Sequence, residues 1–399
     1  MGDKRILVIM LALALLASCS DTKPFLRERA PVLFGRLEDR PNNNDVLTLY
    51  TLGDWGTGKS AQKAVAEGLR QNVLEIPTGR KVKPFVLGLG DNVYEHGLPE
   101  GWNNPQTIAL LERTFGDVYA NIKYEGEHLT FHIVPGNHDY SGRAGGKDGY
   151  GDIIHQETTA ESLYSYWKYY PIDPERNADS NDSTDYAALR NEDILTLTTP
   201  EKISAGGSRL AVFAIDTQVL LDLYDANDDE RLTLHWRKLA ALVSQSQADW
   251  KMVIGHHPIR SHGKHGGFIK GFWWIPPLTI YALVDKLFVK RKQDLDHPAN
   301  RRFQHDLQEF MEKHDITFYV AGHDHCLQFL RISDRHLQIV SGSAGKLAGV
   351  THKKDTYYSH EAHGFTRFDL TPDEAWIEFF QVDPKRGVVS ESGLFRVAK

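Results

Sequence analysis

Five short apolar segments of this chain end in the same way, and this repetition limits the folds that the chain can adopt. Each segment ends in a glycine, and a residue that can bind a metal ion follows directly. The five are VLTLYTLG before Asp54, FVLGLG before Asp91, FHIVPG before Asn137, KMVIG before His256 and FYVAG before His323. Short uninterrupted apolar segments are typical of strands buried on both faces, and glycine permits a sharp exit from the strand.

The segments between these strands favour an α/β arrangement, because residues 59–73 and 233–246 have the pattern of helices. In α/β sheets, functional residues gather at the carboxyl ends of the strands. We therefore expect the five polar residues to meet in one cluster. Gly-Asp and Gly-Asn are also common turn dipeptides, so any one of them alone can be a simple turn. Their repetition after five apolar segments favours the cluster.

Two histidines at the end of the last segment can both face this cluster. In an extended segment, residues two apart point the same way, so His323 and His325 share a side while Asp324 faces away. A single histidine is usually structural, and the 19 histidines of this chain cannot all be ligands. The spacing and the neighbours of this pair distinguish it. The pair can supply ligands to two neighbouring ions.

The composition excludes one large class of partners. With 41% apolar and 25% charged residues among 399, the chain has an ordinary globular composition. Its length permits two or three domains or one large α/β domain. A protein that binds the phosphate backbone of nucleic acids needs a basic face, whereas this chain has a net charge of -7. We therefore expect no nucleic-acid partner.

The first residues indicate export. Lys4 and Arg5 precede an apolar run, residues 6–16, which is too short to cross a bilayer as a mature helix. This is the pattern of a secretory signal, and we interpret residues 1–18 as a signal peptide. Residues 16–19, LASC, resemble the lipobox of bacterial lipoproteins, in which the cysteine becomes the acylated first residue. An ordinary signal peptide followed by a chance cysteine is the alternative.

Cys19 is therefore the predicted lipidation site. It would anchor an exported protein to the cell envelope, on the periplasmic side of an outer membrane or at the cell surface. Residues 19–45 contain three prolines and the sequence NNND, and we interpret them as a tether. Cys326 then has no intramolecular partner, so no structural disulfide is expected. The sequence predicts no oligomeric state.

The five blocks around the predicted polar residues carry a family resemblance. GDWG, GDNVY, GNHD, VIGH and GHDH resemble, in order and type, the metal-binding blocks of the purple acid phosphatases within the calcineurin-like metallophosphoesterases. The small, tartrate-resistant type is the most similar, and the resemblance covers roughly residues 46–390. It implies an α/β fold in which two mixed β-sheets pack as a sandwich flanked by α-helices, a four-layer αββα arrangement. It also implies one catalytic domain, residues 46–399, that acts as a two-metal hydrolase.

The resemblance assigns seven ligands to two ions. One ion would be bound by Asp54, Asp91, Tyr94 and His325, and the other by Asp91, Asn137, His256 and His323, with Asp91 as the bridge. The first set contains a private carboxylate and a phenolate, and such hard, negative ligands favour Fe(III). The second set has only neutral ligands besides the bridge, which suits Fe(II), Zn(II) or Mn(II). Tyr94 is the discriminating residue, because relatives without it ordinarily use divalent metals.

The same resemblance implies the reaction. Two ions about 3.5–4 Å apart can hold a phosphate oxygen, activate a water as hydroxide and neutralise charge at phosphorus. His138 is the first candidate for contacting the phosphate, with Asp139 expected to orient it. His265 matches a His-Gly element of the family and would be a substrate-side imidazole. His257 and His262 are further candidates in the same segment.

The expected substrate is a small-molecule phosphate monoester. Two alternatives keep the cluster but change its use. A phosphodiesterase or nucleotidase would have the same metal site and different pocket walls. A non-catalytic metal- or phosphate-binding surface lipoprotein would be expected to lack a ligand, and none is missing.

An insertion of about residues 262–300 departs from the small family members. It contains the sequence GGFIKGFWWIPPLTIYALVDKLFVKRK, with adjacent tryptophans and a basic end. One hypothesis is an interfacial element that lies against the membrane, since Trp, Lys and Arg favour such positions. The other is a lid or hairpin packed on the protein's own surface. Residues 141–160, which are rich in glycine, are expected to form a mobile wall of the site.

Overall fold

The structure is a computed structural model. It describes residues 20–98, 105–140, 159–169, 210–268 and 291–399, and residues 194–197 by their backbone. The predicted signal peptide, Cys19, the tryptophan pair of the insertion and most of the glycine-rich segment lie outside the described residues. No helix in the described part of the chain combines the length and the apolar character needed to cross a bilayer.

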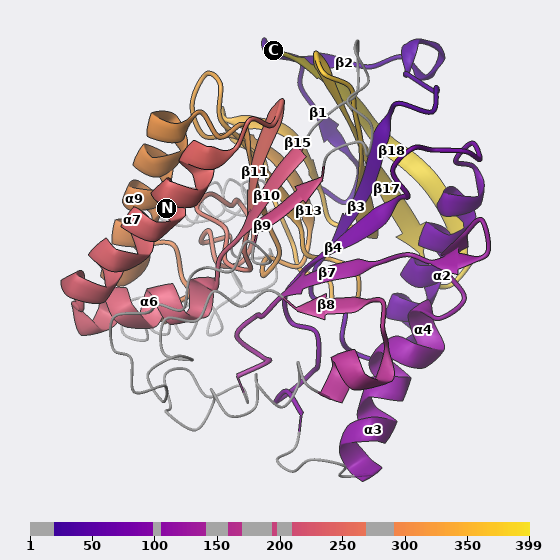
Figure 1. The fold of residues 1–399 in the computed structure, drawn as a ribbon, viewed down its shortest axis with the longest axis horizontal. Coiled ribbons are helices and arrows are strands. Elements are labelled where there is room, and N and C mark those ends of the chain that lie inside the picture. Colours follow the sequence, from indigo (N-terminus) through magenta and orange to yellow (C-terminus); the bar gives the residue numbers. More distant parts are fainter. Residues whose placement is uncertain (1–19, 99–104, 141–158, 170–193, 198–209, 269–290) are drawn as a thin grey trace, which may run out of the picture.

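The described residues form two large sheets that face each other (Figure 1). The strands of the first sheet, in spatial order, are β1 (Phe25–Leu26), β15 (Thr356–His360), β13 (Leu327–Arg331), β14 (Leu337–Ser341), β12 (Phe318–Ala321), β11 (Trp250–Ile254), β10 (Leu210–Ala214) and β9 (Ile194–Leu197). Within it, β10, β11, β12 and β14 run parallel, and the outer pairs are antiparallel.

The second sheet has the same mixed character. Its strands, in spatial order, are β2 (Val32–Phe34), β18 (Val388–Ala398), β17 (Glu374–Asp383), β16 (His363–Leu370), β3 (Leu47–Leu52), β4 (Phe85–Leu89), β7 (Phe131–Val134) and β8 (Trp167–Tyr169). Here β3, β4, β7 and β8 are parallel, whereas the C-terminal strands join by antiparallel pairing. A separate short pair is formed by β5 (Lys123–Tyr124) and β6 (Glu127–His128).

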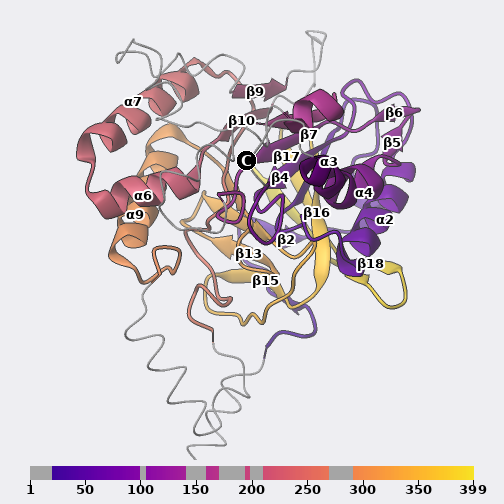
Figure 2. The ribbon, with the colours of Figure 1, turned by 90° about the horizontal axis from the view of Figure 1, so that it is seen from below.

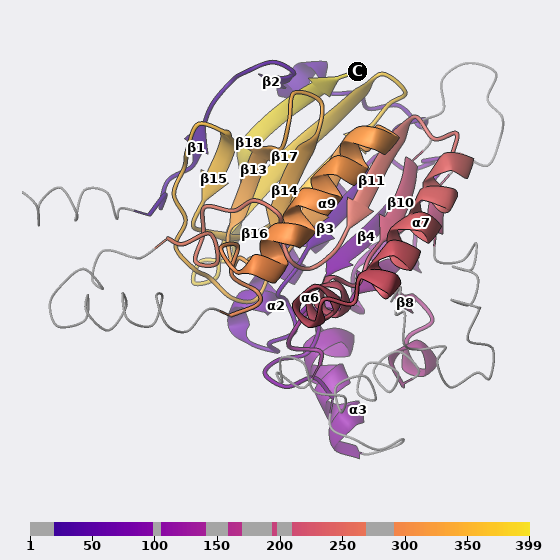
Figure 3. The same ribbon diagram turned by 90° about the vertical axis from the view of Figure 1, so that its left-hand side faces the viewer.

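Helices cover the outer face of each sheet. The first sheet is covered by α6 (Thr217–Ala226), α7 (Asp229–Gln245) and α9 (Pro298–His314), as Figure 3 shows. The second is flanked by α2 (Ser60–Leu74), α3 (Pro105–Leu111) and α4 (Asp117–Tyr119). Figure 2 shows the two helical groups on opposite sides of the sheets. The predicted four-layer αββα fold is confirmed, and α2 and α7 match the two predicted helices.

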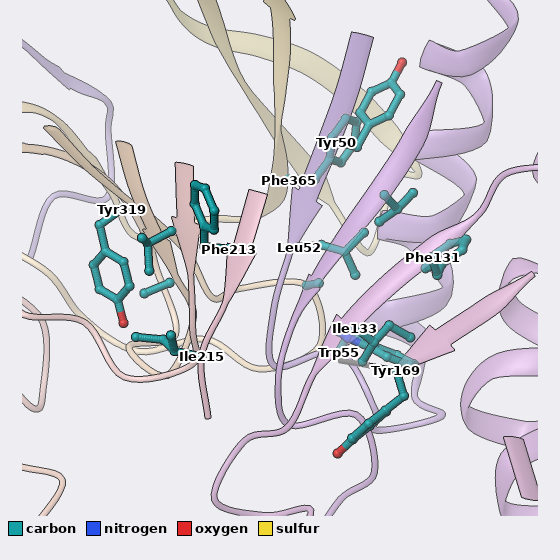
Figure 4. Packing of buried hydrophobic residues seen from close by; sticks show 14 of the residues in the cluster. Tyr50, Leu52, Trp55, Phe131, Ile133, Tyr169, Phe213, Ile215, Tyr319 and Phe365 are labelled. Atoms are coloured by element: carbon teal, nitrogen blue, oxygen red, sulfur yellow. The ribbon is translucent and has the colours of Figure 1, made fainter. Parts of the chain in front are cut away.

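The central strands are apolar throughout because both of their faces are buried. All six residues of β3 are buried. Leu47 and Leu49 belong to a core that joins residues of both sheets, whereas Tyr50 and Leu52 pack on the helical side (Figure 4). This period-two division explains why the five segments read as continuous apolar runs instead of alternating ones.

The predicted tether, residues 19–45, is corrected by the structure. Its described part contributes the edge strands β1 and β2, which pair with β15 and β18. Pro24 and Pro31 directly precede these two strands, a position where proline removes no ladder hydrogen bond. Arg40 forms ion pairs with Asp369 and Glu378, whose side chains are almost fully buried. These contacts hold the segment on the sheets, because open edges and buried carboxylates both need partners.

Candidate metal centre

The loops after the five apolar strands lie together. β3, β4 and β7 of one sheet and β11 and β12 of the other are each followed by one of the predicted polar residues. Backbone hydrogen bonds join the loops: the amide of Asp54 donates to Gly90 O at 3.0 Å, and that of Gly322 donates to His256 O at 3.0 Å. The amide of Gly53 donates to Ser341 O at 2.7 Å and so connects the two sheets. The carboxyl ends of both sheets therefore build one site.

Three of the predicted ligands have a left-handed backbone, which is rare for residues other than glycine. Asp54, Asp91 and His323 have φ angles of 57°, 54° and 66°. Such conformations cost about 1–3 kcal/mol each and persist only where the surroundings enforce them, typically at functional sites. Close packing enforces them here: a Cβ on Gly136 would lie 2.3 Å from the backbone nitrogen and Oδ1 of Asp91. The backbone is thus shaped to direct these side chains inward.

One group of side chains surrounds the phenol of Tyr94. Its hydroxyl donates to Asp91 Oδ2 at 2.6 Å and lies 3.0 Å from Asp54 Oδ1. His325 Nε2 lies 3.2 Å from Asp54 Oδ1 and 3.5 Å from the Tyr94 hydroxyl. These four residues are the predicted ligands of the first ion, and the structure brings all four together.

A second group surrounds Nε2 of His256. This nitrogen lies 3.1 Å from Asn137 Oδ1, 3.4 Å from Asp91 Oδ1 and 3.2 Å from His323 Nδ1. The other ring nitrogen, Nδ1, donates to the carbonyl of Leu89 at 2.8 Å, which leaves Nε2 as an acceptor directed into the group. These are the four residues predicted for the second ion. Asp91 contacts both groups, through Oδ2 in the first and Oδ1 in the second, and so lies where a bridging carboxylate is expected.

The electrostatics of the two groups favour positive charge between them. Asp54 and Asp91 are fully buried and both contact the phenol. Burial opposes ionisation of Asp91, yet His256 and His138 outweigh it and hold the pKa of this carboxyl below its usual range. Burial, together with Asp54 and Asp91, raises the pKa of Tyr94 well above its ordinary value. A cation bound between the groups would compensate the negative charges of the carboxylates and would lower the pKa of the phenol.

The imidazoles of the cluster fall into two kinds. Burial opposes the charge on His256, yet Asp91 and Asp54 raise its pKa above the ordinary value. Burial lowers the pKa of His323 and His257 well below the ordinary value, and neighbouring imidazoles add to the effect. Nε2 of each ring is buried and has no hydrogen-bond partner among the described residues. Candidate ligand atoms of His256, His257 and His323 lie within 4.8 Å of one another, as do those of Asp54, Asp91 and His256. Buried lone pairs without partners, beside paired carboxylates, fit a pair of bound cations.

His138 lies at the rim of the cluster. Its side chain is 27% exposed, its ring packs on Tyr94, and its Nε2 is 4.0 Å from Asp91 Oδ2. Nδ1 donates to the carbonyl of Glu95 at 2.6 Å, so Nε2 is the nitrogen left for a ligand. The expected role of Asp139 in orienting His138 stays a prediction, and its carboxylate has a further role. Its carboxylate accepts from the amides of Asn92, Val93 and Gly136, and so ties two of the loops together.

The three histidines that follow His256 in the segment after β11 have different settings. His265 stacks on His323, with ring centroids 4.0 Å apart. His257 is fully buried, and its Nδ1 contacts the Thr217 hydroxyl at 2.8 Å. With Nδ1 on Thr217, the ring presents its buried Nε2 beside His256 and His323, and a substrate-side role for His257 stays a prediction. His262 pairs with Asp355 at 2.7 Å, which gives it a structural partner.

Sequence reasoning missed three residues around the cluster. Lys346 Nζ lies 3.6 Å from the centroid of the Tyr94 ring and 2.9 Å from Glu95 Oε2. The hydroxyl of Thr217 accepts from the amides of both His256 and His257. Asp294 contacts His265. These residues come from segments without a repeated pattern, so only the fold reveals them. The local sequence offers one signal for Lys346: the glycine directly after β14, in SGSAGK, indicates that the backbone there packs closely against another segment.

The comparisons with known proteins agree with this geometry. The model of the calcineurin-like phosphoesterase family matches residues 47–327, which is more than half of the chain. The chain therefore belongs to the calcineurin-like phosphoesterase family. Within that family it is similar to purple acid phosphatase 7 of Arabidopsis thaliana, with 23% identity over 87% of this chain and 86% of that protein. It is similarly related to tartrate-resistant acid phosphatase type 5 of Sus scrofa, with 23% identity and 88% coverage of both chains.

Solved structures extend the likeness at the level of the fold. GAP50, described as the anchor in the inner membrane complex of Plasmodium, matches with a TM-score of 0.55 and 18% identity, covering 88% of this chain and 89% of that one. Purple acid phosphatase PPD1 from yellow lupin, Lupinus luteus, matches with a TM-score of 0.50 and 13% identity, covering 90% of this chain and 55% of that one. Because the fold includes a protein described as an anchor, the site and not the fold must carry any assignment of activity.

Proposed function

We propose that this metallophosphoesterase is an acid phosphatase that hydrolyses small phosphate monoesters at a two-metal centre. One observation supports this proposal above the others. Seven side chains that follow the ends of five strands meet in two groups. Asp91 belongs to both groups and contacts each through a different oxygen. The similarity to purple and tartrate-resistant acid phosphatases favours the same chemistry.

The residues of the site would have separate roles in binding the metals and the substrate. Asp54, Asp91, Tyr94 and His325 would hold one ion, and Asp91, Asn137, His256 and His323 the other. A metal pair bound there would supply Lewis-acid stabilisation of the phosphate and a water of lowered pKa. His138 would contact the phosphate through Nε2, because its Nδ1 is held by Glu95 O. His265 would lie on the substrate side and stabilise the departing oxygen.

Tyr94 favours iron at the first site. The phenol lies between two carboxylates, and three such oxygen ligands suit a hard, highly charged ion such as Fe(III). The second group offers an amide oxygen and two imidazoles beside the shared carboxylate, which suits Fe(II), Zn(II) or Mn(II).

We also propose export and membrane anchoring through Cys19. The support is the signal-like sequence before it and the contact directly after it. Ser20 Oγ donates to Val350 O at 3.0 Å and accepts from Val350 N at 2.8 Å. The residue that follows the proposed lipid attachment is therefore bound to the folded body, which would lie close to the membrane surface.

Hydrolysis of phenyl phosphate and of diphenyl phosphate by the purified protein tests the function. We expect turnover of the monoester at acidic pH, much slower turnover of the diester, and none in the Asp91→Asn variant, whose bridging carboxylate is lost. Preferential hydrolysis of the diester would replace the proposal with a phosphodiesterase. Absence of turnover for both esters by metal-loaded protein would overturn the assignment of a hydrolase.

A further inference from the structure

We propose that Asp294 is a positioning residue for the reaction, which holds His265 through Nδ1 so that Nε2 is presented to the substrate. This inference rests on the proposed function, in which His265 is a substrate-side imidazole. Asp294 lies in the described residues at the C-terminal end of the insertion, a region in which sequence reasoning assigned no catalytic part.

The contact between the two side chains is direct. Asp294 Oδ1 lies 2.9 Å from His265 Nδ1, and the side chains are 28% and 12% exposed. The carboxylate can only accept from the ring, so Nδ1 carries the hydrogen. Burial opposes the charge on Asp294, yet His265 and Arg291 keep the pKa of its carboxyl below the ordinary value. An ionised partner makes the hydrogen bond charge-assisted and therefore directional.

His265 is held at three points. Besides the ring contact, its backbone amide donates to Asp324 Oδ1 at 3.0 Å, and its carbonyl accepts from the amide of Leu295 at 3.1 Å. The residue therefore lies between the loop after β12 and the loop that carries Asp294. Its ring packs on His323 with an interplanar angle of 33°. With Nδ1 bound to Asp294, Nε2 has no hydrogen-bond partner among the described residues and is the nitrogen left for a ligand.

The loop that carries Asp294 is itself fixed by two helices. Asn300 of α9 donates to the carbonyls of Lys292 and Gln293 at 3.3 and 3.2 Å, and Gln304 donates to that of Leu295 at 2.7 Å. Lys292 forms ion pairs with two aspartates of α6, at 3.2 and 3.0 Å. A carboxylate that merely screened charge would not need such support. A carboxylate that sets the angle of an imidazole needs this support, because a displaced carboxylate would also displace the imidazole relative to the reacting atoms.

The test compares two neutral substitutions in the same loop. Asp294→Asn removes the charged acceptor, whereas Asp296→Asn makes the same charge change two residues away, at a partly exposed side chain. With phenyl phosphate as substrate, we expect Asp294→Asn to lower kcat by about tenfold or more while changing KM by less than about threefold. Asp296→Asn should stay within about twofold of the wild type.

A double-mutant cycle separates positioning from a general structural effect. In a His265→Ala background, Asp294→Asn should cause almost no further loss, because the residue acts through the absent imidazole. Wild-type kcat in Asp294→Asn, or an equal loss with and without His265, would overturn the proposal.

Nitrogen NMR of histidine-labelled, Zn(II)-loaded protein supplies a readout that is independent of turnover. We expect a fixed Nδ1–H signal that is lost in His265→Ala and in Asp294→Ala, which has no acceptor, and kept in Asp296→Ala. Persistence of this signal in Asp294→Ala would contradict the inference. If no phosphate ester is hydrolysed, the proposed function fails, and the NMR comparison still decides separately whether Asp294 holds His265.

Discussion

In the proposed function, Tyr94 is the residue that favours iron at the first metal site. Its phenol is buried, and its hydroxyl contacts both Asp54 and Asp91. Without a cation, burial and these two carboxylates raise its pKa and keep the proton on the ring. A phenolate at this position therefore requires a strongly charged ion beside it.

The first prediction concerns this residue. The wild-type protein, purified with iron, should be coloured through the bond between phenolate and Fe(III), and Tyr94→Phe should be colourless with its visible absorption lost. Activity with divalent ions should survive in part, because three ligands of the first group remain. A colourless wild-type protein that contains two zinc or manganese ions would refute the iron assignment and leave the hydrolase intact.

The second prediction concerns Gly136, where an added Cβ would meet the backbone and carboxylate of Asp91 at 2.3 Å. Gly136→Ala should shift Asp91 and Asn137 and lower kcat by on the order of a hundredfold, since small displacements of reacting groups are costly. The control is Gly126→Ala, in the exposed turn between β5 and β6, where nothing lies within 4 Å of the added Cβ; its φ of 84° makes the variant cost stability in the turn but leaves the site untouched. Equal activity of the two variants would show that close packing does not shape the site.

At the scale of single residues, sequence predicts well which candidate ligands lie together and predicts the residues that support them poorly. Each predicted ligand lies directly after a strand or two to three residues beyond another ligand, so the local pattern exposes it. Asp294 and Lys346 reach the cluster from segments whose position depends on tertiary packing. Asp139 stands in a predicted block, but the backbone amides that donate to its carboxylate reach it only because β4 and β7 place their loops side by side.

At the scale of elements, α7 contains a histidine that links stability to pH. His235 is fully buried on the inner face of this helix, and neither ring nitrogen has a hydrogen-bond partner among the described residues. Burial lowers the pKa of His235 to about 4. Below its ordinary pKa near 6.5, the unfolded chain takes up a proton that the folded chain refuses. Stability is therefore lost as the pH falls from about 6.5 towards about 4.

The third prediction follows from this sign. His235→Leu removes the proton uptake and keeps a side chain of similar size. Between pH 7 and pH 4, the free energy of unfolding of the variant should rise relative to the wild type by up to roughly 3 kcal/mol. Denaturant unfolding at several pH values measures the difference. Parallel pH profiles for the two proteins would contradict the assigned cause.

Elements differ in how well the sequence predicts them. The five apolar strands that precede the predicted polar residues, β3, β4, β7, β11 and β12, and the helices α2 and α7 have clear sequence patterns and were expected. The edge strands β1 and β2 have two and three residues, which is too short for any periodicity. Their strand conformation comes from pairing with β15 and β18, so their sequence was interpreted as a tether.

At the scale of the whole molecule, the fold brings the N-terminal segment next to the loop that follows the site. Ser20 binds Val350, and Lys346 of the same loop lies over the ring of Tyr94. A lipid on Cys19 would therefore hold the catalytic body near the membrane without an intervening tether. The prolines of this segment predicted a tether instead. The local sequence could not indicate the strands, because β1 and β2 pair with residues more than 300 positions away.

The fourth prediction tests this anchoring. Cys19→Ala in the full chain should move the exported protein from the membrane fraction to the soluble fraction, with unchanged turnover of phenyl phosphate. Cys326→Ala is the matched control, since this buried thiol has no part in anchoring. Membrane retention of Cys19→Ala would show that another segment, such as the insertion, holds the protein there.

The account depends centrally on a pair of metal ions held by seven side chains. A metal titration of the chelator-treated protein, followed by hydrolysis of phenyl phosphate, measures this most directly. We expect activity to return in proportion to added metal and to reach its plateau at two equivalents per chain. A plateau at one equivalent, or full activity without added metal, would contradict the two-metal centre.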